Sequence, residues 1–190
     1  RNNGQVCISP NRFYIHEKKK DEFASLMVEK TKKLKIGNGM DKDTLLGPLC
    51  TKQRLEGVEK LVETTKKEGG KVLLGGKRAA NFNKGYYYEP TIFDDVEDNF
   101  TVMKEEPFGP IVPILTFKDF DEVMKRANDN DLGLCSYIYT TDLKKANKAS
   151  ELIESGCVAV NTPVVAVAEA PFGGIKQTGY GREGGSMAIK

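Results

Sequence analysis

Short runs of β-branched and aromatic residues alternate along this chain with longer segments whose apolar residues recur at helical spacing. The pattern predicts strands or extended segments at residues 12–16, 71–74, 85–93, 111–115, 135–139 and 158–160, and helices at 18–34, 52–68, 119–128 and 142–153. Such alternation favours an α/β fold, a three-layer α/β/α sandwich around a mostly parallel sheet. Sheets of this class bind ligands at the carboxyl ends of their strands, so we expect a site there.

Local signals mark the ends of these elements. Gly69-Gly70 ends the second helix, and Asp119 with Glu122 three residues later has the spacing of a capping box. The composition changes at residues 161–190, where Gly, Ala and Pro become frequent. That change predicts a packed functional loop rather than a regular element.

Length and composition indicate a single globular domain. With 190 residues the chain can bury one substantial core, and no linker or internal repeat divides it. Its 29 basic and 27 acidic residues give a net charge of +2, which provides no strong attraction to nucleic acid or anionic lipid. No run approaches the roughly 18 apolar residues of a membrane span. We therefore expect a cytoplasmic protein that binds neither nucleic acid nor membranes.

The four cysteines are widely spaced, without a Cys-x-x-Cys pair or the density of a secreted disulfide framework, so we expect reduced thiols. Three of them, Cys50, Cys135 and Cys157, lie in apolar strand or loop contexts. We interpret these three as structural residues, because an unpaired cysteine usually behaves as a small buried apolar side chain.

Cys7 admits a second interpretation, because it follows a Gly-Gln turn almost at the start of the chain. Gly4 allows the backbone to approach a ligand closely, and Cys7 can present its thiol and its own N–H to one substrate atom. The neighbouring Arg1 and Arg12 favour a thiolate. Taken alone, the residue is therefore either a buried structural cysteine or a nucleophile.

Two loops carry residues suited to binding a flat, sugar-bearing molecule. In the segment 104–110, the adjacent carboxylates of Glu105 and Glu106 can hold a sugar diol by a bidentate hydrogen bond while the ring of Phe108 packs on a heterocycle; an acidic surface turn is the alternative. In the segment 171–174, Phe172 projects from a loop with little side-chain bulk. That ring is either a pocket wall or a packing anchor.

Other catalytic classes have weaker support. His16 is the only histidine and lies beside a lysine run at the end of a predicted strand, where a surface role is favoured over a catalytic one. No set of His, Cys and Asp residues has the spacing of metal ligands, and Gly37-Asn38-Gly39 lacks the strand-to-helix setting of a phosphate loop. We expect neither a metal site nor a phosphate loop.

Four motifs, taken in order, resemble the aldehyde dehydrogenase superfamily over the full length of the chain. They are Asn2-x-Gly-Gln-x-Cys7-x4-Arg12, Gly47-Pro48, Glu105-Glu106-Pro107-Phe108-Gly109-Pro110 and Pro171-Phe172-Gly173-Gly174-x-Lys176-x2-Gly179-x-Gly181-Arg182-Glu183. The resemblance implies that residues 1–190 form the catalytic, nucleophile-bearing domain. It also implies that the dinucleotide-binding domain, the general-base glutamate and the oxyanion asparagine of the family precede this sequence.

The resemblance also implies roles for individual residues. Cys7 matches the catalytic nucleophile, Glu106 the carboxylate that binds the nicotinamide ribose, Phe108 its stacking neighbour and Phe172 an aromatic wall of the aldehyde tunnel. The implied cofactor is NAD or NADP, bound mainly by the missing domain. The implied partners are a small aldehyde and further copies of the subunit, in a homodimer or homotetramer.

Within the superfamily, the sequence around Arg1 and the run Pro-Phe-Gly-Gly-Ile-Lys-Gln-x-Gly resemble the succinate-semialdehyde dehydrogenase branch, in which Arg1 helps to bind the substrate carboxylate. Ala166 departs from that branch, which often has serine there. Ser9 occupies the place where some members carry a second, redox-switching cysteine, so no disulfide switch is expected at Cys7. A CoA-acylating dehydrogenase and a non-catalytic scaffold protein that retains the fold are the alternatives.

Overall fold

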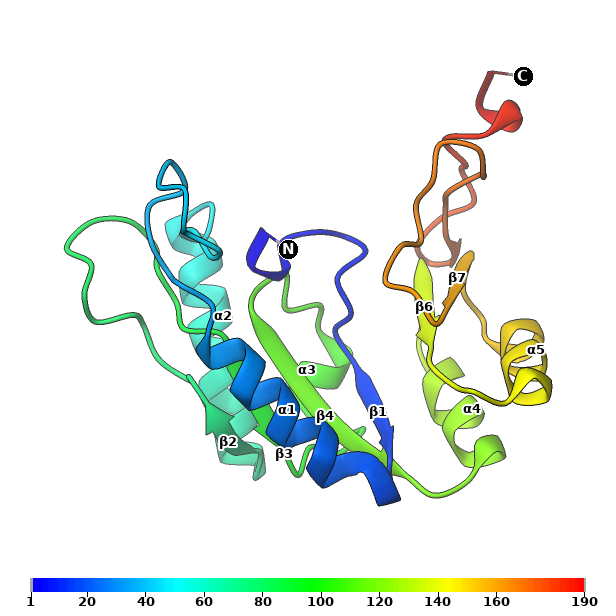
Figure 1. Cartoon of the computed structure of the whole chain (residues 1–190), viewed down its shortest axis with the longest axis horizontal. Helices are drawn as coiled ribbons and strands as arrows, with labels where there is room; N and C mark the ends of the chain where they lie inside the picture. Colours follow the sequence, from blue (N-terminus) through cyan, green and yellow to red (C-terminus); the bar gives the residue numbers. More distant parts are fainter. Residues whose placement is uncertain (1, 190) are drawn as a thin grey trace. The chain divides into compact units, whose positions relative to one another are not determined.

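The computed structural model of the chain describes residues 2–189. It divides into two compact units, Arg1–Lys118 and Asp119–Lys190, which are coloured blue to green and green to red in Figure 1. Both units combine parallel strands with helices. The α/β class predicted from the sequence is therefore confirmed.

The first unit is built on a four-stranded sheet in the order β1-β4-β3-β2. Its strands are β1 (Phe13–His16), β2 (Lys71–Leu74), β3 (Thr91–Asp94) and β4 (Ile111–Phe117). The central strand β4 runs parallel to both β1 and β3, and only β2 is antiparallel to its neighbour. The sheet is thus mostly parallel, as the pattern of alternating strands and helices predicts.

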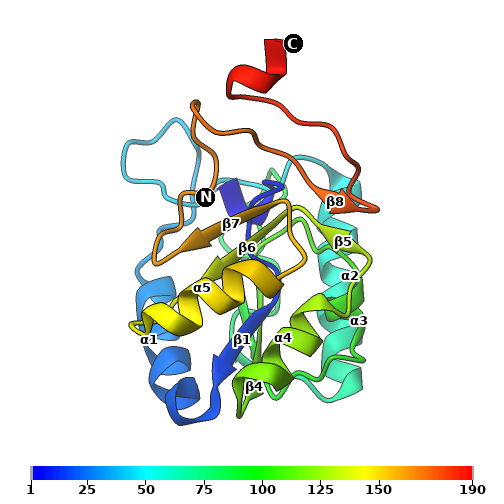
Figure 2. The ribbon, with the colours of Figure 1, turned by 90° about the vertical axis from the view of Figure 1, so that its right-hand side faces the viewer.

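Alternate residues of the central strands face two separate cores. Phe93, Ile111 and Leu115 pack with α2 (Lys52–Glu68) and α3 (Thr101–Lys104). Ile92 and Ile114 point the other way and pack with α1 (Lys20–Lys32). Figure 2 shows α1 and α2 on either side of strands β1 and β4. Burial of each large apolar side chain contributes about 1.5–3 kcal/mol, so both helical layers are held to the sheet by apolar burial.

An ion pair adds a polar connection between α1 and the sheet. The Nζ of Lys20 lies 2.6 Å from the buried carboxylate of Asp94, at the end of β3. The hydrogen bond to Asp94 raises the pKa of Lys20 above its ordinary value, and the neighbouring carboxylates of Asp95 and Asp21 act in the same direction against burial. The first turn of α1 is therefore anchored at the carboxyl end of the sheet.

Capping side chains explain where the helices begin. The side chain of Thr51 accepts a hydrogen bond from the N–H of Arg54 and starts α2, which ends at Gly69 with φ of 112°. Asp119 caps α4 (Phe120–Asn128) by accepting from the N–H of Glu122, as its spacing predicts. The first long helix begins later than predicted, at Lys20, because residues 17–19 form a 3-10 turn.

The second unit contains two small sheets. Strands β6 (Cys135–Ile138) and β7 (Cys157–Val160) pair in parallel, while β5 (Leu132–Gly133) and β8 (Ile175–Lys176) pair antiparallel. Helix α5 (Leu143–Leu152) connects β6 to β7. From residue 161 the described chain is mostly irregular, apart from β8 and a 3-10 turn, Ser186–Ile189. This agrees with the predicted loop. Within residues 2–189, no helix is long and apolar enough to cross a membrane.

Candidate functional site

Cys7 lies on an exposed turn between the 3-10 turn Asn2–Gly4 and strand β1. Backbone hydrogen bonds from Gln5 N to Asn2 O and from Ser9 N to Val6 O, both 2.9 Å, define the turn. Its exposure shows that Cys7 is not a buried structural residue. The thiol is accessible to a substrate, as a nucleophile requires.

The Cys7 turn packs directly on the loop that carries Glu106 and Phe108. A Cβ added to Gly4 would lie less than 3.0 Å from the carbonyl oxygen of Gly109, and the φ of Gly4 is 73°. Only glycine allows this approach without strain. Sequence positions about a hundred residues apart are therefore brought together, which unites two of the predicted motifs in one place.

The loop before β4 is fixed from its other side by α2. A Cβ on Gly109 would meet Val58 Cγ2 at 2.5 Å, and Nη1 of Arg54 donates a 3.1 Å hydrogen bond to the carbonyl of Pro107. Pro107 and Gly109 are buried. The loop is thus a rigid support between helix α2 and the Cys7 turn.

The two predicted cofactor residues differ in environment. Glu106 is exposed, so its carboxylate is available to a ligand, whereas Phe108 is half-buried. Phe108 has φ of 39°, a left-handed conformation that is rare for a large side chain. Because strained backbone of this kind concentrates at ligand sites, it supports a functional role for the loop.

The predicted location of the site at the carboxyl ends of the strands is wrong for these residues. Cys7 precedes β1, and Glu106 and Phe108 precede β4, which runs parallel to β1. Both segments therefore lie at the amino ends. The rule that α/β sheets bind ligands at the carboxyl ends of their strands concerns the loops that follow the strands. In this chain, the candidate residues lie in the loops that precede β1 and β4.

Two amide side chains that the sequence did not single out attach the Cys7 turn to the segment 47–50. Nδ2 of the buried Asn3 donates to the carbonyl of Gly47. Oε1 of Gln5 accepts a 2.9 Å hydrogen bond from the N–H of Cys50. Their position within the Cys7 motif was a signal for a supporting role, but nothing in the sequence identified their partners.

The remaining predicted residues of the first unit occupy varied positions. Arg1 lies outside the described residues, and Arg12 is half-buried. His16 follows β1 to its carboxyl end, where Nδ1 accepts from Lys18 N at 3.2 Å and the ring packs edge-on against Phe117. The histidine therefore caps the 3-10 turn Glu17–Lys19 at the end of β1, in agreement with the non-catalytic interpretation.

The other cysteines are free thiols, but they do not all fit the structural interpretation. Cys135 and Cys157 are half-buried, and the Cys157 thiol lies 3.6 Å from the carbonyl of Gly173. Cys50 is exposed, so its expected burial is wrong. It follows the buried Leu49, and the next two residues, Thr51 and Lys52, are exposed as well.

Phe172 belongs to the second unit and is half-buried. Its N–H and carbonyl pair with those of Glu183 at 2.7 and 2.9 Å. Nη1 of Arg182 donates to Gly174 O at 2.7 Å, and Cβ atoms added to Gly156 or Gly173 would clash with neighbouring backbone. The loop that carries Phe172 is therefore held by its own backbone contacts.

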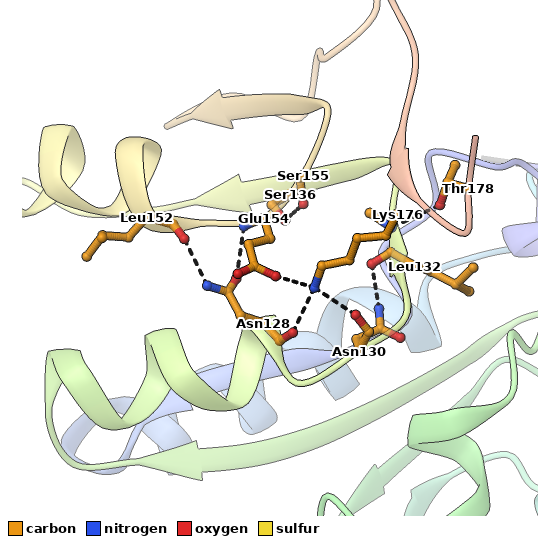
Figure 3. Close-up of polar contacts among 10 residues, drawn as sticks. Asn128, Asn130, Leu132, Ser136, Leu152, Glu154, Ser155, Lys176 and Thr178 are labelled. Atoms are coloured by element: carbon orange, nitrogen blue, oxygen red, sulfur yellow. Dashed lines mark hydrogen bonds and ion pairs between the residues drawn. The ribbon is translucent and has the colours of Figure 1, made fainter. Parts of the chain in front are cut away.

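A lysine anchors the segment after this loop. Figure 3 shows the Nζ of Lys176 between the carbonyls of Asn128 and Asn130, at 2.9 and 2.8 Å, and the carboxylate of Glu154. The Asn128 side chain in turn accepts from Glu154 N and donates to Leu152 O. Lys176 has φ of 55°. The ammonium thus joins the ends of α4 and α5 to β8, immediately after the Phe172 loop.

Comparison with known proteins identifies the family of the chain. The model of the aldehyde dehydrogenase family matches residues 1–190. The chain therefore belongs to the aldehyde dehydrogenase family.

Relatives of known name share the sequence over nearly the whole chain. Succinate-semialdehyde dehydrogenase (NADP+) 2 of Schizosaccharomyces pombe is 38% identical, with 98% of this chain and 38% of the relative aligned. Betaine aldehyde dehydrogenase of Brucella anthropi is 39% identical over 98% of the chain and 39% of the relative. The NAD+ complex of aldehyde dehydrogenase from Bacillus cereus superposes with a TM-score of 0.94 at 40% identity, covering 98% of this chain and 38% of that one. The chain thus spans less than half the length of these relatives.

Proposed function

We propose that residues 1–190 form the nucleophile-bearing catalytic domain of an NAD(P)-dependent aldehyde dehydrogenase that oxidises a small aldehyde to the carboxylic acid. The observation that carries this proposal is the exposed Cys7 on a turn packed against the Glu106–Phe108 loop. An exposed thiol on a rigidly supported turn also argues against a scaffold protein that merely retains the fold. In the whole enzyme we infer a homodimer or homotetramer, as the family resemblance implies.

In this account, the Cys7 thiolate adds to the aldehyde carbon and forms a C–S bond, while the carbonyl oxygen becomes an oxyanion. The N–H of Cys7 stabilises that oxyanion together with a donor from outside this chain. Loss of hydride from the same carbon leaves a thioester on Cys7. Water then cleaves the C–S bond, which yields the carboxylic acid and returns the thiol.

The residues present fit a nicotinamide cofactor. When bound, the cofactor supplies the hydride acceptor. The exposed carboxylate of Glu106 offers two acceptor oxygens for a ribose diol, and the loop that holds it contacts the Cys7 turn. Phe108 provides an apolar surface beside it. The Schizosaccharomyces pombe relative is named for NADP+, and the Bacillus cereus structure is an NAD+ complex. Both support a nicotinamide dinucleotide as the class of cofactor.

For the substrate, we propose a small semialdehyde such as succinate semialdehyde. The relative from Schizosaccharomyces pombe supports this choice, while the relative named for betaine aldehyde represents a cationic substrate. Arg1, which precedes the described residues, is proposed to bind the substrate carboxylate, because a guanidinium favours an anionic aldehyde. Phe172 is proposed as an aromatic wall of the substrate tunnel. Assays of both aldehydes in a reconstituted enzyme test the choice, since a preference for betaine aldehyde contradicts it.

The isolated chain is expected to produce no NADH or NADPH from aldehydes, because hydride transfer requires an acceptor held within reach of the thiol adduct. The measurement follows absorbance at 340 nm with the purified chain, a panel of aldehydes and either cofactor. Circular dichroism and alkylation of Cys7 verify that the chain is folded and its thiol intact. Turnover above background that disappears in Cys7→Ser contradicts the expectation.

A further inference from the structure

We propose that Gln5 is a positioning residue that orients the Cys7 thiol and N–H toward a substrate carbonyl by accepting a hydrogen bond from the N–H of Cys50. This inference rests on the proposed function, because it concerns the same nucleophile. It adds a residue that acts through the turn that its side chain holds.

Side-chain contacts help to fix the position of the Cys7 turn. It belongs to no sheet or long helix, and Asn2, Asn3 and Gly4 all have positive φ angles, of 49°, 54° and 73°. A segment with so little regular hydrogen bonding is free to shift unless side chains attach it to the rest of the fold. In addition to the approach of Gly4 to Gly109, the side chains of Asn3 and Gln5 attach the turn to the segment 47–50.

The partner of Gln5 is fixed to the core. Leu49, next to Cys50, is 1% exposed, and its N–H donates to the carbonyl of Tyr86 at 2.9 Å. Thr51 on the other side caps α2. The N–H of Cys50 therefore sits between two anchored residues, and a hydrogen bond to it transfers that rigidity to the turn.

The amide of Gln5 is used at both ends. While Oε1 accepts from Cys50, Nε2 donates to Asn2 O at 3.3 Å, and Asn2 Nδ2 donates to Gln5 O at 3.0 Å. Asn3, two residues before Gln5, forms a second attachment by donating to the carbonyl of Gly47. Gln5 lies only two residues from Cys7, so its attachment to Cys50 is close to the thiol along the chain.

Two chemical probes separate positioning from simple accessibility. Alkylation by iodoacetamide requires only an accessible thiolate. Acylation by p-nitrophenyl acetate forms an S–C bond to the acetyl carbon and expels nitrophenolate, so it also benefits from the Cys7 N–H at the developing oxyanion. The ratio of the two rates at Cys7 therefore reports the orientation of the thiol and the N–H together.

The experiment compares Gln5→Met, which removes the acceptor at similar volume, with Gln5→Glu, which retains an acceptor oxygen. Gln53→Met, at an exposed position on α2, is the matched control. Trypsin places Cys7 in the peptide 2–12 and Cys50 in 43–52, so mass spectrometry measures each thiol separately and Cys50 serves as an internal reference.

For Gln5→Met, the acylation-to-alkylation ratio at Cys7 is expected to fall about tenfold, the order expected from loss of one orienting hydrogen bond. Gln5→Glu and Gln53→Met are expected to stay within about threefold of the original chain. An unchanged ratio in Gln5→Met, or a ratio in Gln5→Glu as low as in Gln5→Met, overturns the proposal. If Gln5→Met does not fold, Gln5→Glu decides. A lowered ratio in folded Gln5→Glu overturns the proposal. An unchanged ratio, together with protection of the Cys50 amide from hydrogen exchange, supports the proposal.

If a reconstituted enzyme that contains the original chain fails to oxidise aldehydes but the ratio falls as expected, the orienting contact is supported and the proposed function is not. The two failures are therefore distinguishable. If Gln5→Met lowers the activity of a reconstituted enzyme without changing the acylation-to-alkylation ratio at Cys7, only the proposed role of Gln5 is overturned.

Discussion

Gly4→Ala is expected to slow acylation of Cys7 by at least about tenfold, because the turn must move away from the Glu106–Phe108 loop. The added Cβ would lie less than 3.0 Å from the carbonyl of Gly109. That carbonyl belongs to a buried loop packed against Val58, so the turn rather than the loop has to shift. The positive φ adds about 1–2 kcal/mol of strain for a residue with a side chain.

The measurement combines p-nitrophenyl acetate kinetics at Cys7 with urea denaturation. A decrease of about 1–2 kcal/mol in the free energy of unfolding is expected, since the turn is peripheral to both cores. Gly39→Ala is the matched control, because a Cβ there meets open space at an ordinary φ. If Gly4→Ala acylates as fast as Gly39→Ala, the turn does not depend on its approach to Gly109.

Gly156→Ala is expected to lower the free energy of unfolding of the second unit by about 1–3 kcal/mol, through overpacking against the Phe172 loop. The new Cβ would lie less than 3.0 Å from the carbonyl of Gly173 and 2.9 Å from the Cα of Gly174. On its other side, Gly156 is held by a 3.0 Å hydrogen bond from its N–H to Gly133 O. Neither backbone can retreat without losing a hydrogen bond or a close contact.

Denaturation and hydrogen exchange of the Phe172 amide, which bonds the carbonyl of Glu183, measure this effect. Exchange at that amide is expected to accelerate because the loop is displaced. Gly181→Ala, where the Cβ meets open space, provides the control within the same unit. Equal stabilities and equal exchange rates for the two variants contradict the packing argument.

The sequence predicted the regular elements well where apolar spacing and end signals agreed. Helix α2 occupies the predicted residues, Lys52–Glu68, because its apolar stripe is flanked by Thr51 and Gly69. By contrast, α3 is a single turn of four residues, which is too short to show the helical repeat of apolar residues. The carboxylate of Glu68 caps α3 by accepting from Thr101 N. Strands β5 and β8 are two residues each and escaped prediction for the same reason.

The sequence motifs named the candidate residues, but they did not predict where in the fold these residues lie. Cys7 and Glu106 were identified from local motifs, whereas their location at the amino ends of β1 and β4 depends on strand order and direction. The contacts of Asn3 and Gln5 join positions 44 and 45 residues apart, and no local pattern pairs Asn3 with Gly47 or Gln5 with Cys50. Likewise, the left-handed backbone of Phe108 could not be predicted, because a phenylalanine rarely adopts a positive φ.

The central claim is that Cys7 is the nucleophile of an aldehyde dehydrogenase, and a chimera tests it most directly. Residues 1–190 replace the matching segment of the Schizosaccharomyces pombe relative, which supplies the parts outside this chain. The chimera is expected to oxidise succinate semialdehyde with NADP+. In the chimera, Cys7→Ser is expected to lower kcat/KM at least about a thousandfold. Cys50→Ser is expected to leave kcat/KM within about twofold of the original value. A folded, NADP+-binding chimera without turnover, or a Cys7→Ser chimera that retains activity, would contradict the claim.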